Sequence, residues 1–147
     1  MEKTEKYRLL ERQIDALLEG ETDTIAKMAN VAAILHETFG FWWTGFYRVA
    51  GNELVLGPFQ GPVACMHIPF GKGVCGTAWK RNETVVVPDV EQFPGHIACS
   101  SASRSEIVVP VHGADGAVTA VLDIDSDRLA TFDEEDKVWL EKIVTWL

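Results

Sequence analysis

Three cysteines lie among small or polar neighbours, in the stretches "ACM", "GVCG" and "ACSS" that contain Cys65, Cys75 and Cys99. A cysteine in such surroundings is either an inert buried thiol or a reactive one, depending on whether its environment stabilises the thiolate. An odd number of cysteines does not suit a structural disulfide framework, and the spacings of 10 and 24 residues match no zinc pattern. We therefore expect no bound metal and no other cofactor, and we consider redox chemistry of the thiols.

The stretch "GKGVCG", residues 71–76, also fits the G-x-G-x-x-G pattern of dinucleotide-binding loops. That function requires a long crossover helix after the glycines, and only about eight residues of helix separate Gly73 from Thr84. We therefore favour a thiol site, in which Cys75 lies in the first turn of a short helix. Unpaired N–H groups and the helix dipole at that position stabilise a thiolate, so the sequence predicts an easily ionised Cys75. Gly71 or Gly73 is expected to supply a positive φ.

Three carboxylates are predicted to meet on one face of a β-hairpin. In the strand "VTAVLDIDS", side-chain alternation puts Asp123 and Asp125 on the same face, about 7 Å apart. Glu106 opens the preceding strand "SEIVVPVHG", and pairing across the turn "GADG" puts it opposite these two residues. The cluster is either a solvated strand end or a site that holds an ammonium group. In the second case, one carboxyl that stays protonated could act as a general acid.

Aromatic side chains alternate along the stretch "FWWTGFYRV", residues 41–49. A strand here places Trp43 and Tyr47 on one face and Trp42 and Phe46 on the other. One of the two faces must be core. The other would offer an aromatic wall suited to a methyl-sulfur or cationic group.

The elements that must position these residues follow the order α-α-β-β-β-α-β, a long loop, and β-β-α. Helices are expected over residues 3–19 and 22–39, and a third over "TFDEEDKVWLEKIVTWL" with Val138 on its buried side. We interpret Thr131 and Glu134 as the capping box of this last helix. The loop from Pro88 to Arg104 carries Cys99 and has roughly 17 residues, a length that is uncommon unless the loop is functional.

Hairpin connections dominate this order, so the fold class is α+β with a largely antiparallel central sheet. Two N-terminal helices and one C-terminal helix are expected on one face, with the short helix and the long loop over the other. Residues 1–147 are expected to form a single domain. The formal net charge of -9 argues against nucleic acid and against anionic membrane surfaces as partners. With no apolar run near the ~18 residues of a membrane span, we expect a cytoplasmic protein.

The motifs together resemble one enzyme family. The stretches "FWWTGFY", "GPVACMHIPFGKGVCGTAW", "GHIACSSASRSEIVVPV" and "AVLDIDS" are similar to those of the free methionine-(R)-sulfoxide reductases, which are stand-alone GAF domains. The similarity extends over nearly the whole chain. It implies a GAF fold, usually a homodimer, and an oxidoreductase that reduces free L-methionine (R)-sulfoxide at the expense of thioredoxin.

The resemblance also implies residue roles. Cys99 would be the nucleophile, with Cys75 and Cys65 as resolving thiols. The implied substrate-binding residues are Trp43 and Tyr47 for the methyl-thio end and Glu106, Asp123 and Asp125 for the polar end. Two alternatives are a non-catalytic GAF module that binds a small ligand and a thiol redox sensor that reports oxidation without turnover.

Overall fold

A six-stranded sheet forms the centre of the molecule. The computed structural model describes residues 1–96 and 102–147, so Cys99 lies outside the described residues. The strand order is β3-β2-β1-β6-β5-β4, and every neighbouring pair is antiparallel. The strands are β1 Trp43–Ala50, β2 Glu53–Gln60, β3 His67–Pro69, β4 Val85–Val87, β5 Ser105–His112 and β6 Val118–Ser126. The expected α+β class with an antiparallel sheet is confirmed.

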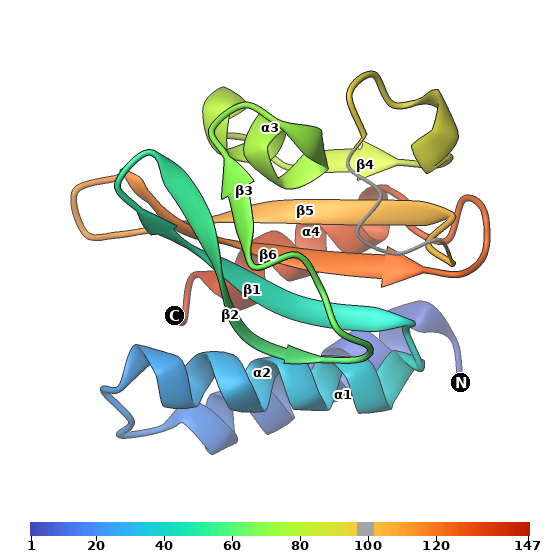
Figure 1. Cartoon of the computed structure of the whole chain (residues 1–147). Coiled ribbons are helices and arrows are strands. Elements are labelled where there is room, and N and C mark those ends of the chain that lie inside the picture. Colours follow the sequence, from blue (N-terminus) through green and yellow to red (C-terminus); the bar gives the residue numbers. More distant parts are fainter. Residues whose placement is uncertain (97–101) are drawn as a thin grey trace.

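Helices cover both faces of this sheet (Figure 1). They are α1 Lys3–Leu18, α2 Thr24–Phe39, α3 Gly73–Arg81 and α4 Glu134–Val144, with a 3-10 turn η1 at Val90–Gln92. Helix α2 packs on β1 and β2, α4 packs on β5, and α1 lies against both α2 and α4. Helix α3 contacts β5 and β6 from the opposite side. The three long helices therefore share one face, as expected, and the short helix has the other.

Two hydrophobic cores follow from the alternation of side chains along the strands. On β6, Leu122 and Ile124 are buried under the three long helices, whereas Val121 is buried in the core beneath α3. On β1, Phe46 belongs to the first core, and Trp43 and Tyr47 belong to the second. The predicted faces of both strands are therefore the observed ones. Several residues of the second core, among them Trp43 and Tyr47, also line the site described below.

The C-terminal helix differs from the prediction at its start. Asp133, rather than Thr131, is the N-cap: its side chain accepts hydrogen bonds from the backbone N–H groups of Glu135 and Asp136, and the Asp136 carboxylate accepts one from the Asp133 N–H. The Thr131 hydroxyl is engaged with Ser126 Oγ at 2.6 Å and is not available as a cap. The expected capping box of Thr131 and Glu134 is therefore wrong by two residues.

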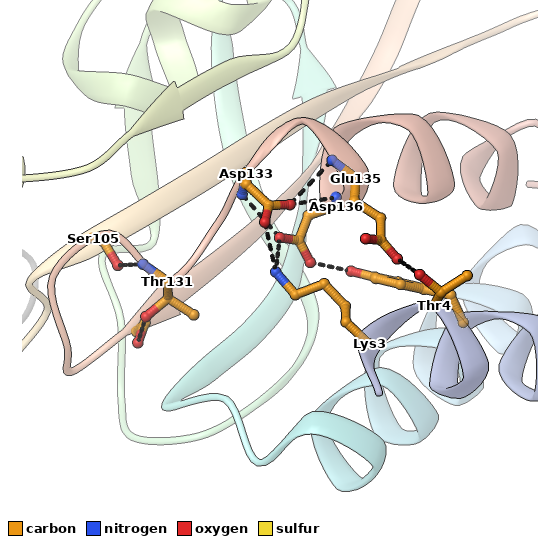
Figure 2. A network of polar contacts seen from close by, with 9 residues as sticks. Lys3, Thr4, Ser105, Thr131, Asp133, Glu135 and Asp136 are labelled. Atoms are coloured by element: carbon orange, nitrogen blue, oxygen red, sulfur yellow. Dashed lines mark hydrogen bonds and ion pairs between the residues drawn. The ribbon is translucent and has the colours of Figure 1, made fainter. Parts of the chain in front are cut away.

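The buried side of α4 also differs, because a charged residue occupies it. Asp136 is almost fully buried, and its carboxylate accepts hydrogen bonds from Tyr7 Oη at 2.6 Å and from Lys3 Nζ at 2.7 Å. Figure 2 shows Lys3 and Asp136 meeting between the N-termini of α1 and α4. Since these partners satisfy the buried charge, Asp136 and Leu140 face inward and Val138 is exposed, contrary to expectation.

Candidate active site

A cavity of about 50 Å³ lies between α3 and the strands β1, β5 and β6. Its wall contains acidic, aromatic and thiol side chains that come from distant parts of the chain. The lining residues that the argument uses are Trp43, Tyr47, Cys75, Glu106, Asp123 and Asp125. Among the predicted site residues, the structure thus brings six together in one place.

Strand register explains why the three carboxylates meet. Glu106 on β5 pairs directly with Asp125 on β6, and Asp123 lies two residues along the same face of β6. Glu106 and Asp123 are each only 5% exposed, and Asp125 is half-buried. The solvated strand end is therefore excluded: the carboxylates are inside the molecule, on the floor of the cavity.

Burial dominates the ionisation of this cluster. It raises the pKa of Glu106 and of Asp125 well above their usual values, and the neighbouring charge of Asp123 raises both further. Burial also raises the pKa of Asp123, although hydrogen bonding within the cluster partly offsets the rise. Like charges at such short range cannot all ionise in a low-dielectric site, so the cluster retains protons near neutral pH.

Asp123 Oδ1 is the buried atom of the cluster for which the described residues offer no hydrogen-bond partner. By contrast, the Ser103 hydroxyl donates a hydrogen bond to Asp125 Oδ1 at 3.1 Å. An unpaired buried acceptor costs roughly 1–3 kcal/mol, and a cationic donor in the cavity would remove that cost.

The aromatic wall is held rigidly. The Trp43 ring stacks on Tyr47 at 5.9 Å and on Phe59 at 5.2 Å between ring centroids. The Trp43 indole N–H donates to the Pro62 carbonyl at 3.0 Å, and the Tyr47 hydroxyl donates to the Cys65 carbonyl at 2.9 Å. These two bonds hold the segment between β2 and β3, and with it the backbone of Cys65, close to the cavity.

The structure overturns the prediction of an easily ionised Cys75. Cys75 does lie in the first turn of α3, but it is only 4% exposed and faces the carboxylates. Burial raises the pKa of its thiol well above the usual value, and the negative charge of Asp123 adds to the rise. The sequence correctly placed Cys75 at the start of a helix, where the dipole lowers a thiol pKa. It could not show that the same thiol is buried beside carboxylates, and this burial raises the pKa by more than the dipole lowers it.

Glycines allow α3 to pack closely against the segment that follows β3. Both Gly71 and Gly73 have positive φ, 75° and 62°, as expected for at least one of them. At Gly76, an added Cβ would lie 2.7 Å from the carbonyl oxygen of Pro69. The helix can therefore carry Cys75 into the cavity only because these positions lack side chains.

Cys65 differs from Cys75 in its bonding. Cys75 is a free cysteine, whereas the half-buried Cys65 is held in a disulfide. The role predicted for Cys99 falls on a residue outside the described ones.

The site predicted from the sequence does not include three polar residues of the cavity wall: Lys72, His96 and Ser103. Each is close in sequence to a predicted site residue, and Ser103 precedes Glu106 by three positions. Proximity along the chain to a predicted site residue was the only signal in the sequence that could have found them. Proximity alone does not indicate which polar residue of a loop faces the cavity.

The fold and this cavity define the class of the protein. A family model described as "GAF domain" matches residues 19–145, and the chain belongs to the GAF domain family. None of the helices in the part of the chain that the structure describes has the length and apolar character that a bilayer crossing requires.

Similar proteins narrow the class. The chain is 56% identical over 146 residues to GAF domain-containing protein A of Dictyostelium discoideum, with 99% of this chain and 92% of that protein covered. It is 47% identical over 148 residues to the free methionine-R-sulfoxide reductase of Escherichia coli, with 100% and 89% covered. A crystal structure of the free methionine-R-sulfoxide reductase from Neisseria meningitidis in complex with its substrate superposes with a TM-score of 0.96 at 53% identity, covering 99% and 88% of the two chains. These matches confirm the resemblance inferred from the motifs.

Proposed function

We propose that this protein is an oxidoreductase that reduces free L-methionine (R)-sulfoxide to L-methionine with its own thiols. The observation that carries the proposal is the cavity itself, which combines a buried carboxylate cluster with an aromatic wall and a cysteine thiol. The names of the similar proteins from E. coli and N. meningitidis support the same substrate.

Each end of the substrate has a complementary part of the cavity. The α-ammonium group is assigned to Glu106 and Asp123, where Asp123 Oδ1 has no hydrogen-bond donor among the described residues. The methyl-sulfur end is assigned to the faces of Trp43 and Tyr47, because thioether and sulfoxide sulfur pack favourably on aromatic rings. A peptide-bound methionine has no free ammonium group, so this arrangement favours the free amino acid.

Cys99 is proposed as the nucleophile. It follows His96 by three residues and precedes Ser103 by four, and both of these residues line the cavity. Because consecutive Cα atoms are about 3.8 Å apart, the chain keeps Cys99 within about 11 Å of the His96 Cα. Attack of its thiolate on the sulfoxide sulfur, with the oxygen protonated by a carboxyl group of the cluster, gives methionine and a sulfenic acid on Cys99. The raised pKa values of Glu106 and Asp125 support this proton-donor role.

Cys65 is proposed as the resolving thiol, in preference to Cys75. Its thiol condenses with the sulfenic acid, water leaves, and a Cys99–Cys65 disulfide remains. A dithiol reductant such as thioredoxin then restores both thiols by exchange. The disulfide-bonded state of Cys65 and the buried, free thiol of Cys75 support this choice.

Separate epimers of the substrate test the proposal. Reduced protein with thioredoxin, thioredoxin reductase and NADPH should convert the R epimer of free methionine sulfoxide and leave the S epimer untouched. Cys99→Ser should abolish methionine release. Equal use of both epimers, or full turnover by Cys99→Ser, would refute the assignment. Disulfide formation with peroxide but without methionine release would instead indicate a redox sensor.

Two further expectations belong to the proposal. We propose a cytoplasmic homodimer, since the chemistry needs a thiol-reducing compartment and the family resemblance implies a dimer. Light scattering of the purified protein would measure the oligomeric state, and a monomer at working concentration would contradict it.

A further inference from the structure

Three potential metal ligands meet in the cavity, and the proposed reaction does not use them as a set. Cys75 Sγ, a carboxylate oxygen of Glu106 and a carboxylate oxygen of Asp123 all lie within 4.8 Å of one another. They come from α3, β5 and β6, three elements that are packed together, and each residue is at least 95% buried. Cys75 has no assigned role in the proposed reaction.

A second observation points to a missing ligand at the same place. Asp123 Oδ1 is buried without a hydrogen-bond donor among the described residues, although its side chain lines the cavity. A buried carboxylate oxygen in this state is stabilised by a cation, which can be an ammonium group or a metal ion.

We propose that Cys75, Glu106 and Asp123 form a binding site for a divalent cation of the Zn²⁺ type. Zinc accepts thiolate sulfur at about 2.3 Å and carboxylate oxygen at about 2.0–2.2 Å. In a tetrahedral site these bond lengths put the ligand atoms roughly 3.3–3.7 Å apart. The three atoms already lie within 4.8 Å of one another. Zinc binding therefore requires their mutual distances to shorten by only about an ångström.

The ligand types select among metals. A thiolate ligand disfavours Mg²⁺ and Ca²⁺, which bind oxygen, and favours Zn²⁺ and its analogues Co²⁺ and Cd²⁺. His96 lines the same cavity and offers a fourth ligand. The site differs from the zinc motifs sought in the sequence, because its ligands come from separate elements instead of one Cys-rich stretch.

Metal binding here has a consequence for the enzyme. The ion and the substrate ammonium group would use the same carboxylates, Glu106 and Asp123, so they exclude each other. Zinc is then a competitive inhibitor, and the cavity responds to free zinc as well as to methionine sulfoxide. The competition with substrate rests on the proposed function. The metal site itself is independent of that function.

A double variant, Cys65→Ser with Cys99→Ser, tests the site with Cys75 as its remaining thiol. Titration with Co²⁺ should give a thiolate-to-cobalt charge-transfer band that saturates at one equivalent and is bleached by Zn²⁺. Added on this background, Cys75→Ala should abolish the band. Glu106→Gln should weaken binding by at least about tenfold, as expected for loss of a ligand. Asp125→Asn, a neighbouring carboxylate outside the three, is the matched control and should keep the band.

Circular dichroism and thermal melting would first establish that each variant is folded. The absence of a charge-transfer band in the folded double variant would overturn the proposal. So would binding that is unchanged by Cys75→Ala and Glu106→Gln, or an equal loss in Asp125→Asn. Free L-methionine should reduce the apparent Co²⁺ affinity. If metal binds through the three ligands but methionine does not compete, the competitive-inhibition consequence is refuted and the metal site stands.

Discussion

Glu106 illustrates how a residue proposed to bind substrate can oppose stability. Its side chain is buried opposite Asp125 and near Asp123, where burial and like charge both raise its pKa. A carboxyl with a raised pKa in the folded state binds protons more tightly there than in the unfolded chain. Its contribution to stability is therefore complete below the unfolded value of about 4.3 and is lost as pH rises through the folded pKa.

Neutralising Glu106 should therefore stabilise the fold as it disables the site. We expect Glu106→Gln to have a higher melting temperature than the wild type at pH 8, by about 2–4 °C for each kcal/mol of repulsion removed. The difference should shrink toward pH 4, while methionine sulfoxide reduction falls sharply. Calorimetry across this pH range measures the effect, with Glu91→Gln at an exposed position as the control. A variant that is less stable than wild type at pH 8 would contradict the electrostatic argument.

Cys75 should be dispensable for turnover. Its buried thiol has a raised pKa and is poorly suited to attack or to resolve a sulfenic acid at neutral pH. We expect Cys75→Ala to retain thioredoxin-supported turnover within about threefold, the spread typical of context effects, whereas Cys65→Ser loses most of it. Steady-state NADPH consumption distinguishes the two variants. If Cys75→Ala loses activity and Cys65→Ser keeps it, the resolving role belongs to Cys75.

At the scale of elements, two kinds of contact join α1 to α4. The buried contact is the hydrogen bond from Tyr7 Oη to Asp136, with the Tyr7 ring stacked on Trp139 at 5.7 Å. The exposed contact is an ion pair between Lys142 and Glu11 at 2.6 Å. Buried hydrogen bonds to charged groups contribute more than surface ion pairs, because water competes for the latter.

Removing the Tyr7 hydroxyl should destabilise the protein and leave the stacked ring in place. We expect Tyr7→Phe to lower the free energy of unfolding by about 1–3 kcal/mol, since Asp136 loses a donor that water cannot replace. Lys142→Gln should cost less than about 1 kcal/mol. Chemical denaturation of the two variants compares them directly. Equal losses would mean that the Asp136 carboxylate is satisfied in another way.

At the scale of the whole molecule, the sheet separates a structural core from the core that contains the cavity. The side covered by α1, α2 and α4 is mainly apolar, with Asp136 as a buried charge, whereas the side under α3 combines apolar residues with the acidic cavity. The chain ends and the three long helices can therefore hold the fold without entering the site. A ligand that fills the cavity binds the folded protein and not the unfolded chain, so it stabilises the fold.

Ligand binding should therefore raise the melting temperature, and the size of the rise for different ligands should report the specificity of the cavity. In Cys99→Ser, which should block turnover, the R epimer of free methionine sulfoxide at 100 times its dissociation constant should add about 2.7 kcal/mol. That corresponds to roughly 5–11 °C for a domain of this size. The S epimer and N-acetylmethionine (R)-sulfoxide, which lacks the ammonium group, should give little shift. Equal stabilisation by the acetylated compound would refute the proposal that the carboxylates bind the ammonium group.

The sequence alone determined what depends on local periodicity. Alternation along β1 and β6 fixed which aromatic and acidic residues share a face, and the hairpin between β5 and β6 fixed that Glu106 lies opposite Asp125. These features were predictable because a strand repeats every two residues and a short turn sets the register.

Only the tertiary structure decided the properties that arise between elements. The ionisation of Cys75 depends on how closely α3 packs on the strands that carry the carboxylates, and the buried position of Asp136 depends on Tyr7 and Lys3 from the opposite end of the chain. The three possible metal ligands likewise come from elements separated in sequence. Burial and charge act through space, and no local pattern along the chain encodes those distances.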